Sequence, residues 1–373
     1  MSGLDADTKK EHNSSSTKRK SSSSVQDSLV DTSKSSFGTR TLNKDDDVFA
    51  FNAWDNVEPD EEYKVYANER IAFQKEHPVP PEQAELYNST PEKYWDIFYG
   101  KNQNRFFKDR NWFYLEFPEL FTWTDQFDEE FILKQPELAS LANKEPLDST
   151  LPAQSSDVNI NTLPAQTNEN TCSVINPQEK HFIMELGCGA GNSVFPLLRA
   201  IKDQRLFVYA CDFSKTAVDV LKGVELYEQD KRCSAFVWDI TQTSLPENVT
   251  EGSIDTILCV FVLSAIHPSK MPTVVNNLYK LLKPGGTLLF RDYGKHDLAQ
   301  VRLKKNRLLE DDFYIRGDGT RVFFFENSTI VSLFSQKFHI LQNGSDKRLI
   351  TNRHRQIKMH RVWIQAKLIK KSL

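Results

Sequence analysis

From residue 181 onward, short apolar runs alternate with helical stretches, and this alternation limits the possible folds more than any other feature. Five runs have the composition of buried strands: "HFIMEL", "LFVYACD", "SAFVWDI", "IDTILCVFVL" and "GTLLFRDY". Helices are expected from Ser193, Ser214 and Ser269. This order of elements is typical of a parallel sheet with helices on both faces. With "RVFFF" and "HRVWIQAKL" as two further strands, residues 180–373 are predicted to form an α/β domain with a seven-stranded, mostly parallel sheet.

The first strand leads into a glycine-rich turn, "ELGCGAGNS". Glycine at such a turn lets a ligand approach bare backbone, and ligands of open α/β sheets bind at the carboxyl ends of the strands. Asp212 ends the second strand, 21 residues beyond the last glycine of the turn, where a carboxylate can accept hydrogen bonds from ribose hydroxyls. The candidate cofactor contacts at the strand ends are Glu185, Gly187, Gly189, Gly191, Asp212, Asp239, Ile240 and Val260.

Three details favour S-adenosylmethionine over a nicotinamide dinucleotide at this turn. The spacing is GxGxG, whereas the dinucleotide fingerprint is GxGxxG with a pyrophosphate at the helix N-terminus. Glu185 would oppose a pyrophosphate but suits the cationic methionyl end of a sulfonium. Asp239 is placed to hold an adenine amino group, with Ile240 packed on the ring. The alternatives are a structural ion pair for Glu185 and a helix cap for Asp239.

The remainder of the chain is uneven in composition. Residues 1–36 are rich in Ser, Lys, Asp and Thr and are expected to be disordered. Residues 37–133 form an aromatic-rich region with helices expected over 59–73 and 91–99, and residues 134–179 form a polar linker. No window resembles a membrane span. The five cysteines include no CxxC pair, which argues against a metal site and is typical of a reducing compartment. The cytoplasm is therefore expected, with the nucleus as an alternative.

Charge is distributed asymmetrically. Residues 41–150 hold 24 acidic and 11 basic side chains, whereas residues 301–373 hold 6 acidic and 16 basic ones. A basic C-terminal region on a chain with a net charge of −4 indicates a polyanionic partner. A solvated surface is the alternative interpretation.

Several blocks outside the glycine turn resemble one enzyme family. They include "FGTRTL", "VFAFNAWDNVE", "KYWDIFY", "FFKDRNWFYLEFPEL", "FVLSAIHPSKM", "RDYGKHDLAQVRLKK" and "FYIRGDGTRVFFF". Together they are similar to the tRNA (cytidine-N3)-methyltransferases over about residues 37–133 and 180–367. The "NAWDNVE" block most resembles the branch that acts on threonine tRNAs. The resemblance implies a Rossmann-like class I methyltransferase that uses S-adenosyl-L-methionine to form 3-methylcytidine at position 32 of the anticodon loop.

The same resemblance alters the interpretation of two aromatic residues. Trp95 and Tyr99 are four positions apart on one helical face, and spacing alone would assign them to a core. The resemblance implies instead that both contact the cofactor from outside the sheet domain.

The chemistry of N3 methylation narrows the candidate catalytic residues. Cytosine N3 already carries an in-plane lone pair, so positioning is expected to supply most of the acceleration. Asp292 is a candidate to stabilise the cationic product base and Tyr293 to stack on it, while a partner for Arg291 or a turn cap is the alternative for Asp292. The Asn/Asp-Pro-Pro-aromatic loop of amino methylation is absent. Cys259 lies in an apolar strand, which argues against the thiolate needed for carbon-5 methylation.

Basic residues near aromatic ones are the candidates for tRNA contact, where phosphate contacts set affinity and register. They are Arg40, Lys108, Arg110, Arg302, Lys304, Lys305, Arg316, Arg321, Arg348, Arg353 and Arg355. For Arg40, Lys108 and Arg110 the alternative is contact with the carboxylate of the cofactor. Two other functions remain open from the sequence. One is a methyltransferase of protein or small-molecule substrates, and the other is a tRNA-binding module without catalysis.

Overall fold

The computed structural model describes residues 37–38, 40–128 and 179–372 of the protein. The predicted tail, Cys172 and all but the last residue of the predicted linker lie outside these residues. All described residues belong to one compact unit.

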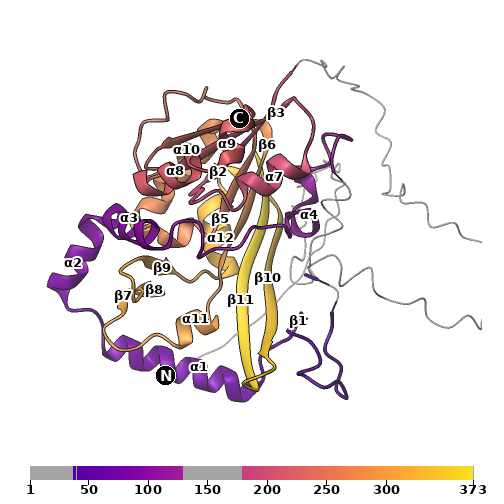
Figure 1. The fold of residues 1–373 in the computed structure, drawn as a ribbon. Helices are drawn as coiled ribbons and strands as arrows, with labels where there is room; N and C mark the ends of the chain where they lie inside the picture. Colours follow the sequence, from indigo (N-terminus) through magenta and orange to yellow (C-terminus); the bar gives the residue numbers. More distant parts are fainter. Residues whose placement is uncertain (1–36, 39, 129–178, 373) are drawn as a thin grey trace, which may run out of the picture. The chain divides into compact units, whose positions relative to one another are not determined.

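The described residues form an eight-stranded sheet in the order β1-β10-β11-β6-β5-β2-β3-β4 (Figure 1). Neighbouring strands from β6 to β4 are parallel, whereas β11, β10 and β1 are added antiparallel to one another and to β6. The strands are β1 (Ala53–Asp55), β2 (His181–Leu186), β3 (Leu206–Asp212), β4 (Cys233–Val237), β5 (Ile254–Val260), β6 (Leu282–Tyr293), β10 (Phe338–Asn352) and β11 (Ile357–Lys370). The predicted fold class is thus confirmed, with one strand more than expected.

Two details of the strand prediction are wrong. The "RVFFF" run does not join the main sheet, because its first residues form β9 (Arg321–Phe323) of a separate three-stranded sheet with β7 (Leu308–Glu310) and β8 (Phe313–Ile315). The main sheet instead gains β10, and β1 from the N-terminal region pairs with the outer edge of β10. An antiparallel edge strand leaves backbone groups open for such pairing.

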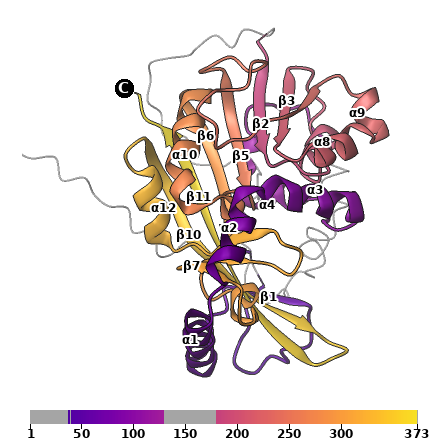
Figure 2. The ribbon, with the colours of Figure 1, turned by 90° about the vertical axis from the view of Figure 1, so that its left-hand side faces the viewer.

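Helices cover both faces of the sheet, as alternate side chains of each strand require. On β5, Ile257 and Cys259 pack toward one apolar cluster and Leu258 and Val260 toward another. The first cluster includes α10 (Met271–Leu281) and α12 (Asn327–Phe334). The second includes α4 (Phe113–Glu116), the 3₁₀ helix η2 (Pro118–Leu120), α7 (Val194–Ala200) and α8 (Lys215–Lys222), followed by α9 (Glu225–Gln229). Figure 2 shows α10 and α12 beside each other on one face.

The helices begin where their local sequences predict. Ser214 caps α8 by accepting a hydrogen bond from the Ala217 backbone, 3.1 Å away. The expected N-terminal helices correspond to α1 (Glu61–Glu76) and α3 (Pro91–Asn102). A further helix, α2 (Pro81–Ser89), was not expected from the sequence, although it begins at a proline suited to a first helical turn.

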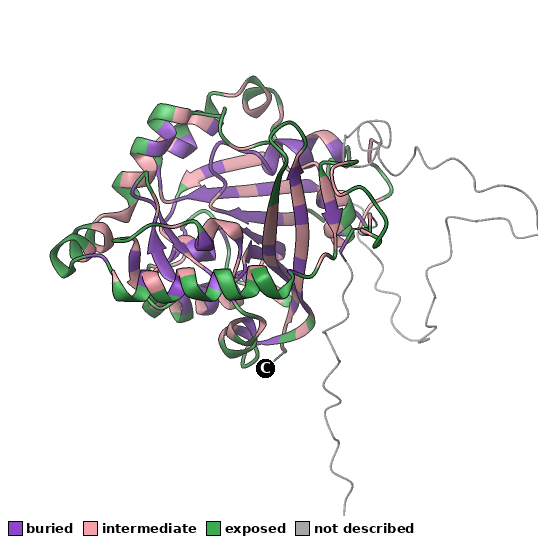
Figure 3. Ribbon diagram, turned by 90° about the horizontal axis from the view of Figure 1, so that it is seen from below, coloured by how far each residue is buried: buried purple, intermediate pink, exposed green. Residues whose placement is uncertain are grey.

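Helix α1 lies on the surface with one buried stripe (Figure 3). Its buried residues are Ala67, Ile71 and Gln74. The Gln74 amide donates hydrogen bonds to the carbonyls of Gln300 and Leu303, at 3.0 and 2.9 Å. These contacts join α1 to α11 (Leu298–Val301) and to the loop that follows it.

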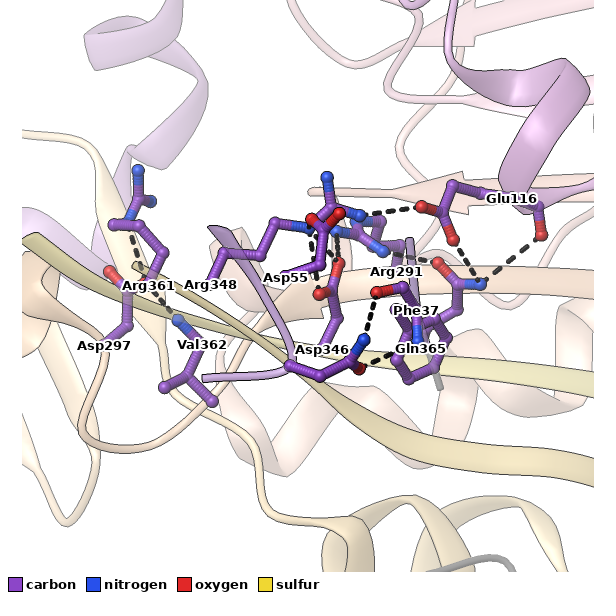
Figure 4. A network of polar contacts seen from close by, with 11 residues as sticks. Phe37, Asp55, Glu116, Arg291, Asp297, Asp346, Arg348, Arg361, Val362 and Gln365 are labelled. Atoms are coloured by element: carbon purple, nitrogen blue, oxygen red, sulfur yellow. Dashed lines mark hydrogen bonds and ion pairs between the residues drawn. The ribbon is translucent and has the colours of Figure 1, made fainter. Parts of the chain in front are cut away.

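A network of buried charges joins the N-terminal region to the β10–β11 hairpin (Figure 4). Arg291 of β6 pairs with the fully buried Asp346 of β10, and its guanidinium lies 5.2 Å from the Trp112 ring centroid and 4.9 Å from that of Trp363. Arg348 pairs with Asp346 at 3.0 Å and with Glu116 of α4 at 2.7 Å. Paired charges of both signs avoid the cost of an isolated buried ion.

Replacing Arg348 by alanine is expected to lower the free energy of unfolding by about 2 kcal/mol, because it removes a cation shared by Asp346 and Glu116. The effect should fall short of a fully buried pair because the Arg348 side chain is 24% exposed. Urea unfolding measures the change. The exposed Arg353 provides the control, since its replacement by alanine should change stability by no more than about 0.5 kcal/mol. Equal effects of the two substitutions would refute a stabilising role for the network.

Candidate active site

The glycine turn follows β2, the middle strand of the parallel part of the sheet, which lies between β5 and β3, where the strand order reverses. Gly187, Gly189 and Gly191 have φ values of 55°, 53° and 89°, which lie in the left-handed region. At Gly189 a Cβ would overlap the hydroxyl of Tyr99. Glycine is therefore required both by the backbone conformation and by the aromatic ring packed on the turn.

Asp212 at the end of β3 braces this turn. One carboxylate oxygen accepts from the Gly189 backbone at 3.0 Å, and the other accepts from the Ser214 backbone at 2.9 Å. Burial raises the pKa of the Asp212 carboxyl to about 6, against the opposing effect of these hydrogen bonds. Asp212 nevertheless lines the cavity, and each carboxylate oxygen can accept a second hydrogen bond.

A cavity of about 260 Å³ lies over the turn, and we call it the cofactor cavity. Trp95 and Tyr99 of α3 form one wall, with their ring centroids 5.9 Å apart and their planes inclined by 27°. Asp239 and Ile240 line it beyond β4. Its other lining residues include Phe107, Lys108, Arg110, Trp112, Asn192, Phe213, Trp238, Phe261, Val262, Ser264, Ala265, Ile266, Tyr293, Arg316 and Arg321.

The segment after α3 is joined to the glycine turn by several hydrogen bonds. The Arg110 backbone donates to the Asn192 carbonyl at 2.8 Å, and the Asn192 amide donates to the Phe107 carbonyl at 3.1 Å. Asp96 of α3 accepts from the Ser214 hydroxyl at 2.6 Å and from the Thr216 backbone at 3.1 Å. The aromatic wall is thus positioned by polar contacts on both sides of the turn.

Glu185 lies beneath the turn and forms an ion pair with Arg110. Its side chain is buried beneath the turn and accepts a hydrogen bond from Arg110 at 3.0 Å, and Arg110 also donates to the Ser193 hydroxyl at 2.6 Å. Burial raises the pKa of Glu185 to about 7, although the Arg110 guanidinium acts in the opposite direction. Glu185 does not line the cofactor cavity, and its ion pair with Arg110 matches the alternative interpretation. Its contact with the cofactor stays a prediction.

At the end of β5, Phe261 lines the cofactor cavity, whereas the predicted contact Val260 is buried and does not line it. Phe261 has a φ of 59°, which is uncommon for a residue with a bulky side chain. Its ring centroid lies 5.0 Å from that of Tyr293. Strained backbone of this kind concentrates at functional sites.

Tyr293 lines the cavity, whereas Asp292 lies behind it. Asp292 is fully buried, and its carboxylate accepts from the backbone of Ser264 and of Tyr293, both at 2.9 Å. Burial raises the pKa of the Asp292 carboxyl to about 6. Asp292 does not line the cofactor cavity, and its direct contact with a substrate base stays a prediction.

A second cavity of about 570 Å³ adjoins the first and shares Phe107, Tyr293 and Arg316 with it. Its other lining residues include Phe98, Phe106, Arg302, Lys304, Arg307, Asp318, Met359 and Arg361. The guanidinium of Arg316 lies 5.1 Å from the centroid of the Tyr293 ring.

The basic residues predicted for tRNA contact have three kinds of surroundings: a cavity, solvent, or contacts with other side chains. Lys108, Arg110, Arg302, Lys304, Arg316 and Arg321 line one or both cavities. Lys305, Arg353 and Arg355 are exposed. Arg348 is engaged with carboxylates, and the guanidinium of Arg40 lies 4.6 Å from the centroid of the Phe51 ring. Their contacts with RNA stay predictions.

The residues present fit S-adenosylmethionine. A nucleoside with an uncharged ribose suits three features of the cavity. These are the glycine backbone without room for side chains, the buried carboxylate of Asp212 that faces the cavity, and the rings of Trp95 and Tyr99.

Among the described residues, no group of three or more His, Cys, Asp or Glu side chains could hold a metal. No described helix has the length and apolar character to span a membrane. The four described cysteines are free, and burial raises the pKa of the Cys259 thiol.

The fold and the site define a class I S-adenosylmethionine-dependent methyltransferase. A family model described as "Methyltransferase domain" matches residues 184–288. The chain is 41% identical over 352 residues to "tRNA N(3)-methylcytidine methyltransferase trm140" of Schizosaccharomyces pombe, covering 94% of this chain and 97% of that one. It is 43% identical to "tRNA N(3)-cytidine methyltransferase METTL2" of Danio rerio, covering 89% and 88%.

A third relative carries a more specific name. It is "tRNA(Thr) (cytosine(32)-N(3))-methyltransferase" of Saccharomyces cerevisiae, at 40% identity over 88% of this chain and 45% of that one. The chain described here belongs to the tRNA N(3)-cytidine methyltransferase family. It is an enzyme of this type, and its cofactor is S-adenosylmethionine.

Replacing Gly189 by alanine is expected to weaken S-adenosylhomocysteine binding at least about tenfold, because a strained left-handed residue costs roughly 1–3 kcal/mol and Tyr99 must also move. Equilibrium dialysis with labelled S-adenosylhomocysteine measures the effect. Gly223 is the control, since its φ of −76° and its ordinary neighbour distances of 3.5 Å accommodate alanine. Undiminished affinity in the Gly189 variant would contradict the assigned role of the turn.

Proposed function

We propose that this enzyme methylates N3 of cytidine 32 in the anticodon loop of tRNA, with threonine tRNA as substrate. The observation that carries the proposal is the extent of similarity to the S. pombe relative, which covers 97% of that enzyme and includes the N-terminal region as well as the sheet domain. The name of the S. cerevisiae relative supports both the position and the tRNA.

The target base has to reach the cofactor cavity from an RNA loop. N3 lies on the Watson–Crick edge, so the base must be unpaired and turned out of its stack. The rings of Phe261 and Tyr293 line the cavity and provide surfaces for such a base. Arg316 packs on Tyr293, and Asp292 fixes the Tyr293 backbone, so the ring is held before substrate arrives.

When bound, S-adenosylmethionine supplies an electrophilic methyl group to the cytosine N3 lone pair. The residues of this chain have to align and enclose the reactants, because N3 needs no base to activate it. Asp212, Trp95 and Tyr99 would hold the nucleoside part of the cofactor. The aromatic faces of Phe261 and Tyr293 would stabilise the positive charge that the base acquires on methylation.

Incubating the purified chain with labelled S-adenosylmethionine and unmodified threonine tRNA is expected to yield 3-methylcytidine, identified by mass after nuclease digestion. A tRNA with uridine at position 32 is the control and should stay unlabelled. Substitution of Asp212 by alanine should reduce labelling at least tenfold, because ribose contacts are lost. Label on protein or on 5-methylcytidine would overturn the substrate assignment, and tRNA binding without methylation would support a non-catalytic module.

A further inference from the structure

We infer that the second cavity is a binding site for an unpaired nucleotide that directly adjoins the target nucleotide. The inference rests on the proposed function, since it takes the target base to occupy the cofactor cavity. The second cavity is lined by aromatic and basic side chains from α3, from the α11–β7 loop, from the β8–β9 turn and from β11.

The two adjoining cavities are arranged so that each could hold one of two consecutive nucleotides of the RNA strand. The two cavities share Phe107, Tyr293 and Arg316 as lining residues. The glycine turn, Asp212 and Asp239 line the cofactor cavity but not the second one. A base in the second cavity would therefore lie beyond Tyr293 from the cofactor, while the nucleotide next to it in the strand could enter the cofactor cavity.

The second cavity contains an aromatic surface suited to a base. The Phe106 ring is 58% exposed although it packs against Phe98 and Phe107, with both centroid distances at 4.9 Å. Stacking on such rings is a common way to hold bases of single-stranded RNA, because every base has a π face.

The charges of the second cavity favour an anionic ligand. Five of its lining residues are cationic, and Asp318 is the single carboxylate among its described lining residues. Arg361 already pairs with Asp297 at 2.8 Å, and Arg307 donates to the Arg316 carbonyl at 3.0 Å. The five cations are Arg302, Lys304, Arg307, Arg316 and Arg361.

Arg302 and Lys304 are the cations available for a phosphate. Both are exposed, and neither makes an ion pair with any described residue. An aromatic platform with unpaired cations at its edge matches a nucleotide, in which the base and phosphate are joined by a sugar. An acidic peptide would use the cations but would leave the Phe106 ring without a planar partner.

A double-mutant cycle between protein and RNA tests the inference by binding alone. The full chain, with S-adenosylhomocysteine present, is titrated with anticodon stem-loops of threonine tRNA, each carrying one abasic position in the loop, and Kd is read by fluorescence anisotropy. An abasic site at one neighbour of the target should weaken binding about tenfold. This penalty should disappear in the Phe106→Ala variant, which lacks the stacking surface.

Leu86→Ala is the matched control for this cycle. Leu86 is also 58% exposed but lines neither cavity, so this variant should keep the full abasic penalty. In a separate titration against salt, Arg302→Ala should reduce the slope of log Kobs by about 0.7, the value for one phosphate contact on a single strand. An unchanged slope would remove Arg302 from the site.

The outcomes separate this inference from the proposed function. The inference would be overturned if, at both neighbours of the target, an abasic site weakened binding equally in Phe106→Ala and in the parent. It would also be overturned if the parent failed to bind the stem-loop. The inference would also be overturned if Phe106→Ala removed only the penalty of an abasic site at the target position, because the second cavity would then hold the target base. Methylation of cytidine 32, measured by nucleoside analysis, decides the proposed function independently of each of these results.

Discussion

The contact between Tyr99 and Gly189 is the constraint on which the active site depends. The backbone of the turn is left-handed at Gly189, and the Tyr99 hydroxyl occupies the space that a side chain would need. A ring from the N-terminal region is thereby placed directly over the glycine turn of the sheet domain. The cofactor cavity exists only where these two parts of the chain meet, so neither part alone contains the site.

Buried polar contacts keep the two parts in this position. Near the turn, Arg110 reaches Glu185 and Ser193, and Asp96 reaches the start of α8. At the antiparallel side of the sheet, Arg348 pairs with Glu116 of α4 and with Asp346, and Asp346 also pairs with Arg291. Removing one partner of such a buried pair costs more than the pair contributes, because the other charge is left unpaired. The ion pairs and hydrogen bonds thus set how the N-terminal region lies on the sheet domain, and the apolar clusters stabilise that arrangement.

The sequence predicted the parts of the structure that follow from local patterns. The apolar run over His181–Leu186 became β2 with the expected bounds, and the spacing of glycines and Asp212 located the cofactor cavity. Strand β10 was missed because its "NGSD" stretch has turn-forming residues, and pairing with β1 and β11 overrides that tendency. "RVFFF" was misplaced because periodicity identifies a strand but not its partner.

The roles of single side chains depended on tertiary contacts that no pattern contains. Asp292 directly precedes Tyr293 in β6, and successive side chains of a strand point to opposite faces. Glu185 is drawn to Arg110 by an ion pair beneath the glycine turn. Neither side chain lines the cofactor cavity. The second cavity combines Phe106 with Arg302 and Met359, residues from distant segments, so it could not be found without the fold.

Calorimetric titration of the full chain with S-adenosylhomocysteine, and separately with NADH, tests most directly whether this cavity is built for a sulfonium nucleoside. Saturable binding of one S-adenosylhomocysteine per chain, with no heat from NADH, is the result that the geometry of Asp212, Tyr99 and the glycine turn predicts. Binding of NADH without S-adenosylhomocysteine would contradict it.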